Sequence, residues 1–108
     1  MTAEHIQVVT TTEDEQDALA IARALVEGRL AACVQVVGPI TSTYRWQGKI
    51  EVGREWQCWA KSRRELIDQI EETIRRLHPY EVPEILAVEI VSGSRDYLAW
   101  LDEQVQGT

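Results

Sequence analysis

One stretch, Leu30 to Ser62, limits what this chain can fold into more than any other. It reads LAACVQVVGPITSTYRWQGKIEVGREWQCWAKS, and β-branched and aromatic residues dominate it. A Gln47-Gly48 pair near its middle separates two such runs, which is typical of two strands joined by a tight turn. Each arm has about a dozen residues or more, so at ~3.3 Å per residue it extends about 40 Å. A domain of this size has a radius of gyration of roughly 13 Å, so we expect the hairpin tip to project from the body.

Both faces of this hairpin are apolar. With the turn at Gln47-Gly48, the register places Ile40, Tyr44, Trp46 and Trp59 on one face and Ile50, Val52, Trp56, Cys58 and Ala60 on the other. An isolated two-stranded ribbon is marginal in water, and exposed aromatic strands favour association. We therefore expect another copy of the chain to cover this arm, with Tyr44, Trp46 and Trp56 as interface residues. The alternative is a hairpin that bends at Gly38-Pro39 or Gly53 and folds onto its own subunit.

Composition narrows the classes of function. A length of 108 residues suits a single domain spanning residues 1–108. The formal net charge of −7 argues against non-specific binding of nucleic acid and against binding to anionic membranes. Cys33 and Cys58 lie out of register across the hairpin, too far apart for a disulfide. The chain shows neither a secretory signal nor the ~18 apolar residues of a membrane span, so we expect a reducing cytoplasm.

The segments that flank the hairpin predict alternating strands and helices. Ile6 to Thr11 is expected to be a strand, and Thr12 to Glu15 has the capping-box pattern that opens a helix. Gly28 is expected to end that helix in a left-handed conformation. Ser62 to Glu65 repeats the capping box before a second helix, which Pro79 should end at His78.

The remainder of the chain completes the order β-α-β-β-α-β. Ile85 to Val91 predicts a last strand and Ser94 the cap of a terminal helix, while residues 1–5 and 106–108 are expected to be a lead-in and a tail. This α+β order predicts a ferredoxin-like sandwich, an antiparallel sheet with both main helices on one face. The last strand is apolar on both sides, although its own helices can cover only one. That is a second, independent reason to expect an oligomer.

Motifs spread over nearly the whole chain carry a resemblance to a known family. They are Leu30-Ala31-Ala32-Cys33-Val34, Pro39-Ile40, Ser42, Tyr44, Trp46, Gly48-Lys49-Ile50, His78-Pro79-Tyr80-Glu81, Pro83-Glu84-Ile85, Asp96-Tyr97-Leu98 and Trp100-Leu101. From about Val8 to Trp100 the chain resembles the CutA family, named for tolerance to divalent cations. The resemblance implies a tight homotrimer whose sheets face the centre and whose hairpins reach across to neighbours. It also implies binding of divalent copper or a similar metal.

Topology indicates which groups such a metal site could use. The first strand and the second helix run the same way, so Thr10 to Thr12 and His78 to Glu81 should lie at one end of the domain. Cys33 begins the second strand at the opposite end, a strand length away. It therefore cannot join a site with His78 within one subunit.

The chain departs from the family pattern at two positions. Some members carry cysteine where this chain has Thr10 and histidine where it has Leu77, and imidazole with thiolate suits copper or zinc. Only His78 remains, with Glu81 and Glu84 as nearby carboxylates. We therefore hypothesise weak binding of copper or another divalent cation at His78 with Glu81.

Ordinary structural roles stand beside this hypothesis. His78 before Pro79 suits a helix C-terminus, where the helix dipole favours an imidazole. The two cysteines are typical of small buried apolar residues. The hairpin aromatics favour interface packing over a ligand cage.

No catalytic motif is present: the chain has no Gly-rich phosphate loop, no nucleophile elbow and no His-x-x-x-His pattern. We expect a protein without enzymatic activity. One class of function is a divalent-cation tolerance homotrimer. The other is a ligand-sensing or scaffold trimer of PII-like architecture, with clefts between subunits and no metal role, an analogy of fold alone. A trimer that acts through a protein partner the sequence does not identify is a third possibility.

Overall fold

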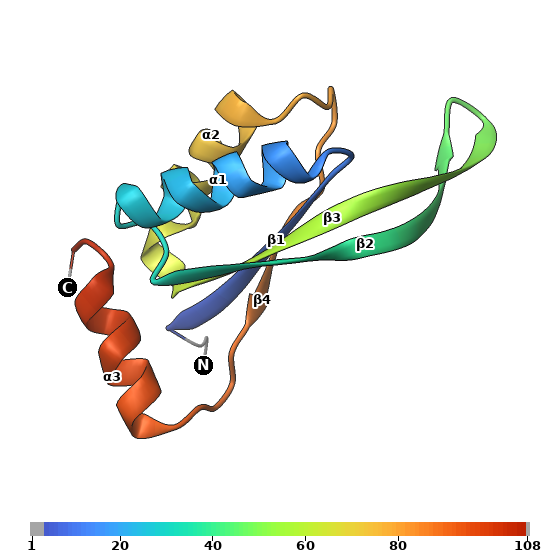
Figure 1. Cartoon of the computed structure of the whole chain (residues 1–108). Helices are drawn as coiled ribbons and strands as arrows, with labels where there is room; N and C mark the ends of the chain where they lie inside the picture. The colour runs from blue at the N-terminus through green and yellow to red at the C-terminus, as the bar shows by residue number, and fades with distance from the viewer. Residues whose placement is uncertain (1–3, 108) are drawn as a thin grey trace.

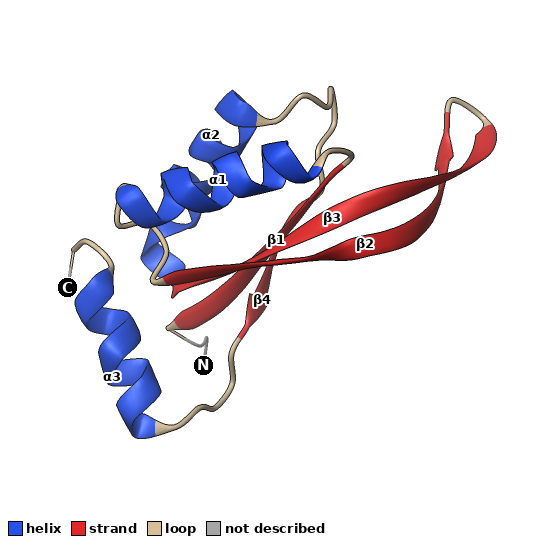
Figure 2. Cartoon of the chain, in the orientation of Figure 1, coloured by secondary structure: helices blue, strands red, loops and turns tan. Residues whose placement is uncertain are grey.

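The computed structural model describes residues 4–107 as an α+β fold. The elements are β1 (His5–Thr12), α1 (Glu15–Glu27), β2 (Cys33–Trp46), β3 (Lys49–Arg63), a 3-10 turn η1 (Arg64–Leu66), α2 (Ile67–Leu77), β4 (Ile85–Glu89) and α3 (Arg95–Gln104). The strands pair antiparallel in the order β2-β3-β1-β4, and α1 and α2 lie on the same side of this sheet (Figure 2). The ferredoxin-like arrangement expected from the sequence is confirmed.

The long hairpin has the predicted turn and projects as predicted. Trp46 pairs with Lys49, and the two residues between them, Gln47 and Gly48, have φ angles of 49° and 80°. Positive φ at both central positions matches the twist of the flanking strands. The described chain measures 44 × 28 × 22 Å along its principal axes, and Figure 1 shows the hairpin tip extending beyond the rest of the domain. The alternative in which the hairpin folds flat onto its own subunit is therefore not what this chain adopts.

A bulge divides the hairpin into two halves. The register of β2 against β3 shifts between Val37 and Ile40, where Gly38 and Pro39 stand opposite Trp56. A Cβ on Gly38 would lie 2.7 Å from a ring carbon of Trp56, so only glycine lets the indole approach the backbone here. The bulge increases the local twist and separates the core-packed half of the hairpin from the projecting half.

The core lies between the sheet and the two main helices. Its members from β1, β3, α1 and α2 include Ile6, Val8, Cys58, Ala60, Ile21, Leu25, Ile70 and Ile74. Two apolar residues of these helices, Val26 and Leu77, do not join the core and are exposed. Each lies in the last turn of its helix.

Neither capping box predicted from the sequence forms. Thr12 is the last residue of β1, and its hydroxyl donates to the Asp14 carbonyl at 2.8 Å, while α1 begins at Glu15. Ser62 lies within β3, is buried, and donates to the Leu30 carbonyl at 2.5 Å, so α2 begins only after η1. Strand pairing extends one or two residues further than the local pattern indicates, and neither α1 nor α2 has a side-chain cap hydrogen bond.

The left-handed residue after α1 is also not the predicted one. Gly28 has φ −80°, whereas Arg29 has φ 57°. The Arg29 guanidinium donates to the carbonyls of Glu103 and Gln104 at 2.7 and 2.9 Å, at the end of α3. Arg29 therefore makes its hydrogen bonds to α3 from a left-handed backbone conformation, which glycine would adopt at a lower cost in free energy.

The two ends of the described chain are tied into the fold. His5, predicted in a lead-in, is the first residue of β1, and its Nε2–H donates to Asp102 at 2.9 Å. Burial disfavours the charged Asp102 carboxylate, but hydrogen bonds from Arg63 and His5 outweigh it, so the pKa of that carboxyl lies below its usual range. Gln106, predicted in a tail, donates its backbone N–H to the Arg29 carbonyl at 2.9 Å. Residues 1–3 of the predicted lead-in and residue 108 of the predicted tail lie outside the described residues. Glu4 directly precedes β1.

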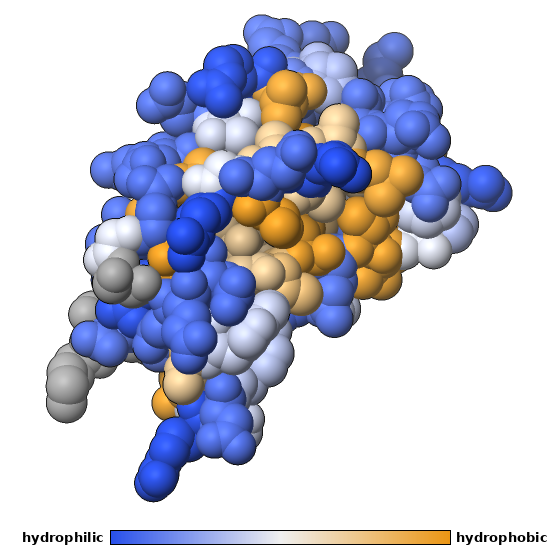
Figure 3. All heavy atoms as spheres, turned by 60° about the vertical axis from the view of Figure 1, so that its left-hand side comes forward, coloured by the Kyte–Doolittle hydropathy of each residue, from blue (hydrophilic) through white to orange (hydrophobic). Residues whose placement is uncertain are grey.

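The helix-free face of the sheet is apolar and uncovered. Val9 pairs with Trp59 and Leu86, on the face opposite the buried Val8. Leu86 and its neighbour on that face, Val88, are 57% and 54% exposed. Figure 3, in which the left-hand side of Figure 1 comes forward, also shows apolar side chains gathered in the middle of that view, with hydrophilic residues around them. Within residues 4–107 no helix has the length and apolar character needed to cross a membrane.

Candidate functional site

The end of α2 and the end of β1 meet, as the topology predicts. Pro79 disfavours helical geometry at His78, which has ψ 130° and closes α2 through its N–H to the Ile74 carbonyl at 2.8 Å. The His78 Nε2–H then donates to the Thr11 carbonyl at 2.7 Å. Cys33 begins β2 at the far end of the sheet, where it pairs with Lys61. It does not take part in this site.

Both nitrogens of the His78 ring are occupied by the backbone. The Tyr80 N–H donates to Nδ1 at 3.2 Å, which leaves the proton on Nε2 for the bond to Thr11. The ring is 8% exposed and lies 4.7 Å from the ring of Tyr80. A metal ion that uses this imidazole must therefore displace one of the two hydrogen bonds.

The other groups near His78 supply few ligands. Glu81 is exposed three residues further along, while no three His, Cys, Asp or Glu side chains of residues 4–107 gather closely enough to hold a metal ion. Thr10 is buried, and its hydroxyl has no hydrogen-bond partner among the described residues. The donor set does not fit a tightly held resident metal.

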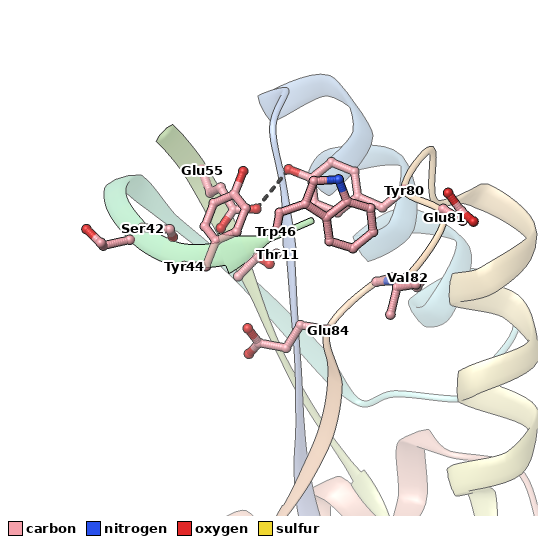
Figure 4. Close-up of a pocket in the computed structure, with 11 residues that line it drawn as sticks. Thr11, Ser42, Tyr44, Trp46, Glu55, Tyr80, Glu81, Val82 and Glu84 are labelled. Carbon is pink, nitrogen blue, oxygen red and sulfur yellow. Dashed lines mark hydrogen bonds between the residues drawn. The ribbon is translucent and has the colours of Figure 1, made fainter. Parts of the chain in front are cut away.

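A pocket of about 660 Å³ opens beside this end of the sheet. It lies between the hairpin and the connection from Tyr80 to Glu84, and Figure 4 shows Tyr44, Trp46 and Tyr80 around it. The Tyr80 hydroxyl donates to the Glu55 carboxylate at 2.8 Å and so ties the connection to β3. Burial, then the hydrogen bond to Glu55, raises the pKa of the Tyr80 hydroxyl. Burial, then the charge of Glu55, likewise raises the pKa of the Glu84 carboxyl.

The predicted site residues are only partly brought together. Tyr44, Trp46 and Glu81 line the pocket, whereas His78 is not a lining residue and is hydrogen-bonded to β1. Trp56 is on the other face of the hairpin, where it packs against the core. Sequence reasoning missed Glu55. Its bond to Tyr80 joins residues 25 apart, and no local sequence pattern indicates it.

The comparisons with known proteins agree with this fold. A family model described as CutA1 divalent ion tolerance protein matches residues 6–104. The chain belongs to the CutA1 family. A CutA1 relative, the divalent-cation tolerance protein CutA of Thermus thermophilus, is 46% identical over 96 residues, which cover 89% of this chain and 93% of that protein. A CutA1 structure from the psychrotrophic bacterium Shewanella sp. SIB1 has 36% identity and a TM-score of 0.95, covering 99% of this chain and 100% of that one.

Not every CutA1 relative has the same length or the same compartment in its name. The mouse (Mus musculus) Protein CutA is 43% identical over 93 residues, which cover 86% of this chain but 52% of the mouse protein. An Arabidopsis thaliana relative is named chloroplastic, and a structure from Archaeoglobus fulgidus is described as periplasmic. Family membership alone therefore does not assign a compartment to this CutA1 chain.

Proposed function

We propose that this chain, as a single domain over residues 1–108, is a cytoplasmic homotrimer that acts without catalysis in tolerance to divalent cations. Its membership of the CutA1 family is the observation that carries this proposal. The exposed Leu86 and Val88 on the helix-free face, with the exposed Tyr44 and Trp46 of the hairpin, supply the surface that further copies would bury. Tyr44, Trp46 and Trp56 are the proposed interface residues.

The proposed metal contact is weak binding of copper or another divalent cation at His78 with Glu81. One imidazole and one carboxylate leave most of the coordination shell to water or to another subunit. Because the Tyr80 N–H occupies Nδ1, the metal competes with a hydrogen bond that already exists. Both points favour a low affinity, which suits a transient response to metal better than a permanent cofactor.

Copper titration with His78→Ala tests the metal contact. Native mass spectrometry of the wild-type protein should give the mass of three chains, and it should show copper bound at millimolar but not at nanomolar concentration. Calorimetry should show that His78→Ala loses the copper heat, while His5→Ala, which removes the other histidine, keeps it. Equal heats for wild type and His78→Ala would exclude this site.

The second candidate function is a ligand-sensing or scaffold trimer without a metal role. The pocket between the hairpin and the connection from Tyr80 to Glu84 favours it, because a volume of about 660 Å³ is typical of small-molecule sites. A small molecule found in that pocket, in a trimer with no copper heat, would favour this function over metal tolerance.

A further inference from the structure

The pocket described above, here called the hairpin pocket, has aromatic walls. Tyr44 and Trp46 extend from the hairpin and Tyr80 from the connection opposite, and Figure 4 shows these rings around one space. Tyr44 and Trp46 remain partly exposed in the single subunit, at 48% and 41%. Aromatic faces carry partial negative charge, and they attract cations that come within about 6 Å of the ring centre.

The charge around the hairpin pocket is negative and lacks a counter-charge. Three carboxylates line it, those of Glu55, Glu81 and Glu84, and none of the described lining residues is basic. Among residues 4–107 none of the three forms an ion pair with a basic side chain. Glu55 is held in place by the Tyr80 hydroxyl at 2.8 Å. A cation that entered the pocket would meet a fixed carboxylate beside aromatic rings.

We propose that the hairpin pocket binds a small organic ammonium cation, with Glu55 opposite its charge and Trp46 and Tyr80 against its methyl or methylene groups. The pocket suits an organic cation better than a bare divalent ion, since aromatic rings donate no metal ligands and no three carboxylates converge. Its volume lies within the range of small-molecule sites. The net charge of −7 also attracts cations to the protein as a whole.

This inference deepens the second candidate function and rests on it, but it does not depend on the metal contact at His78. His78 is not among the lining residues of the pocket. Tyr44 and Trp46 are also proposed interface residues, so the binding test is made on the assembled protein.

Choline and its uncharged isostere 3,3-dimethyl-1-butanol provide the test. The two molecules have nearly the same shape and differ in charge, so the proposal expects choline to bind with millimolar or better affinity and the alcohol at least tenfold more weakly. Binding is measured by calorimetry on the full chain, and light scattering on the same sample reports the number of subunits. Equal binding of the two molecules, or binding of neither, overturns the proposal.

Paired variants locate the binding. Glu55→Gln keeps an oxygen to accept from Tyr80 but removes the charge, and it should weaken choline about tenfold. Glu51→Gln, on the same strand outside the pocket, should leave it unchanged. Trp46→Leu should abolish choline binding, whereas Trp100→Leu, at an equally exposed indole on α3, should not. Equal effects within either pair overturn the proposal.

The outcomes separate this inference from the functions on which it builds. A three-chain mass with a copper heat but no choline heat overturns the ammonium site and leaves metal tolerance standing. A lysine or arginine of another copy filling the pocket would also prevent choline binding, and that result counts against the proposal. A choline heat that depends on Glu55 supports it, whatever the copper titration gives.

Discussion

The thiol of Cys58 shows how burial decides the chemistry of one residue. Its side chain lies in the core beneath α1, 1% exposed, and donates to the Ala18 carbonyl at 3.3 Å. Burial raises the pKa of the Cys58 thiol to about 11, because a thiolate in an apolar core loses its hydration. The thiol is therefore a structural group, as the sequence predicts, and the described cysteines are free.

We predict that Cys58 resists alkylation in the folded protein. At pH 8 a pKa of about 11 leaves on the order of one thiolate in a thousand, and thiolate is the reactive form. In a Cys33→Ser background, which isolates Cys58, iodoacetamide should label the thiol only after denaturant is added. Rapid labelling of the native variant at pH 8 would show that the thiol is accessible and contradict this account.

The raised pKa of the Cys58 thiol also makes the stability of the folded protein depend on pH. The folded pKa is raised above the unfolded value, so the contribution to stability is complete below the unfolded pKa of about 8.5 and declines as pH rises toward 11. The midpoint of urea unfolding should therefore fall between pH 9 and pH 11, and it should fall less in Cys58→Ala.

At the scale of the elements, the hairpin is specified by its turn and its bulge. Gly48 has φ 80°, a conformation that costs other residues roughly 1–2 kcal/mol, and a Cβ there would meet nothing within 4 Å. Replacing Gly48 therefore costs free energy through the backbone conformation and not through a steric clash. Gly53 on the same hairpin also has open space around it and lacks a positive φ.

We predict that Gly48→Ala destabilises the protein by about 1–2 kcal/mol, whereas Gly53→Ala changes its stability by less than about 0.5 kcal/mol. Urea unfolding at one fixed subunit concentration measures both, since oligomer stability depends on concentration. Equal losses in the two variants would mean that the turn conformation does not limit the hairpin.

At the scale of the whole molecule, the single subunit leaves one apolar side of its sheet exposed to solvent. Leu86 and Val88 on β4 are more than half exposed, and the hairpin projects beyond the body that could cover it. Surfaces of this kind in stable proteins are normally interfaces. The other side of the sheet, in contrast, is covered by α1 and α2 of the same chain.

We predict that Leu86→Asp lowers the oligomer mass measured by light scattering at micromolar concentration, because a carboxylate on the helix-free face would be buried without a partner. Leu19→Asp is the matched control: Leu19 is 44% exposed on the outer side of α1, and its replacement should leave the mass unchanged. If Leu86→Asp keeps the wild-type mass, the helix-free face is not where the copies meet.

The sequence by itself predicts the order of the elements, the Gln47-Gly48 turn, the end of α2 at His78, the Ser94 cap of α3 and the family. The structural features among these depend on residues within a few positions of one another, or on apolar patterns along one segment, whereas the family depends on motifs spread along the whole chain. In the structure Ser94 accepts from the Tyr97 N–H at 3.2 Å, as expected from the local pattern.

Only the tertiary structure decided where the polar groups meet. The His78 ring bonds to Thr11, 67 residues away, and Tyr80 to Glu55, 25 residues away. Thr12 and Ser62, suited locally to cap helices, are held in strands instead. The places of Thr12 and Ser62 follow from the pairing of β1 with β3, and the bulge after Val37 adds one extra residue to β2 where the hairpin begins to project. No local pattern carries that geometry, because it arises only when the sheet has formed.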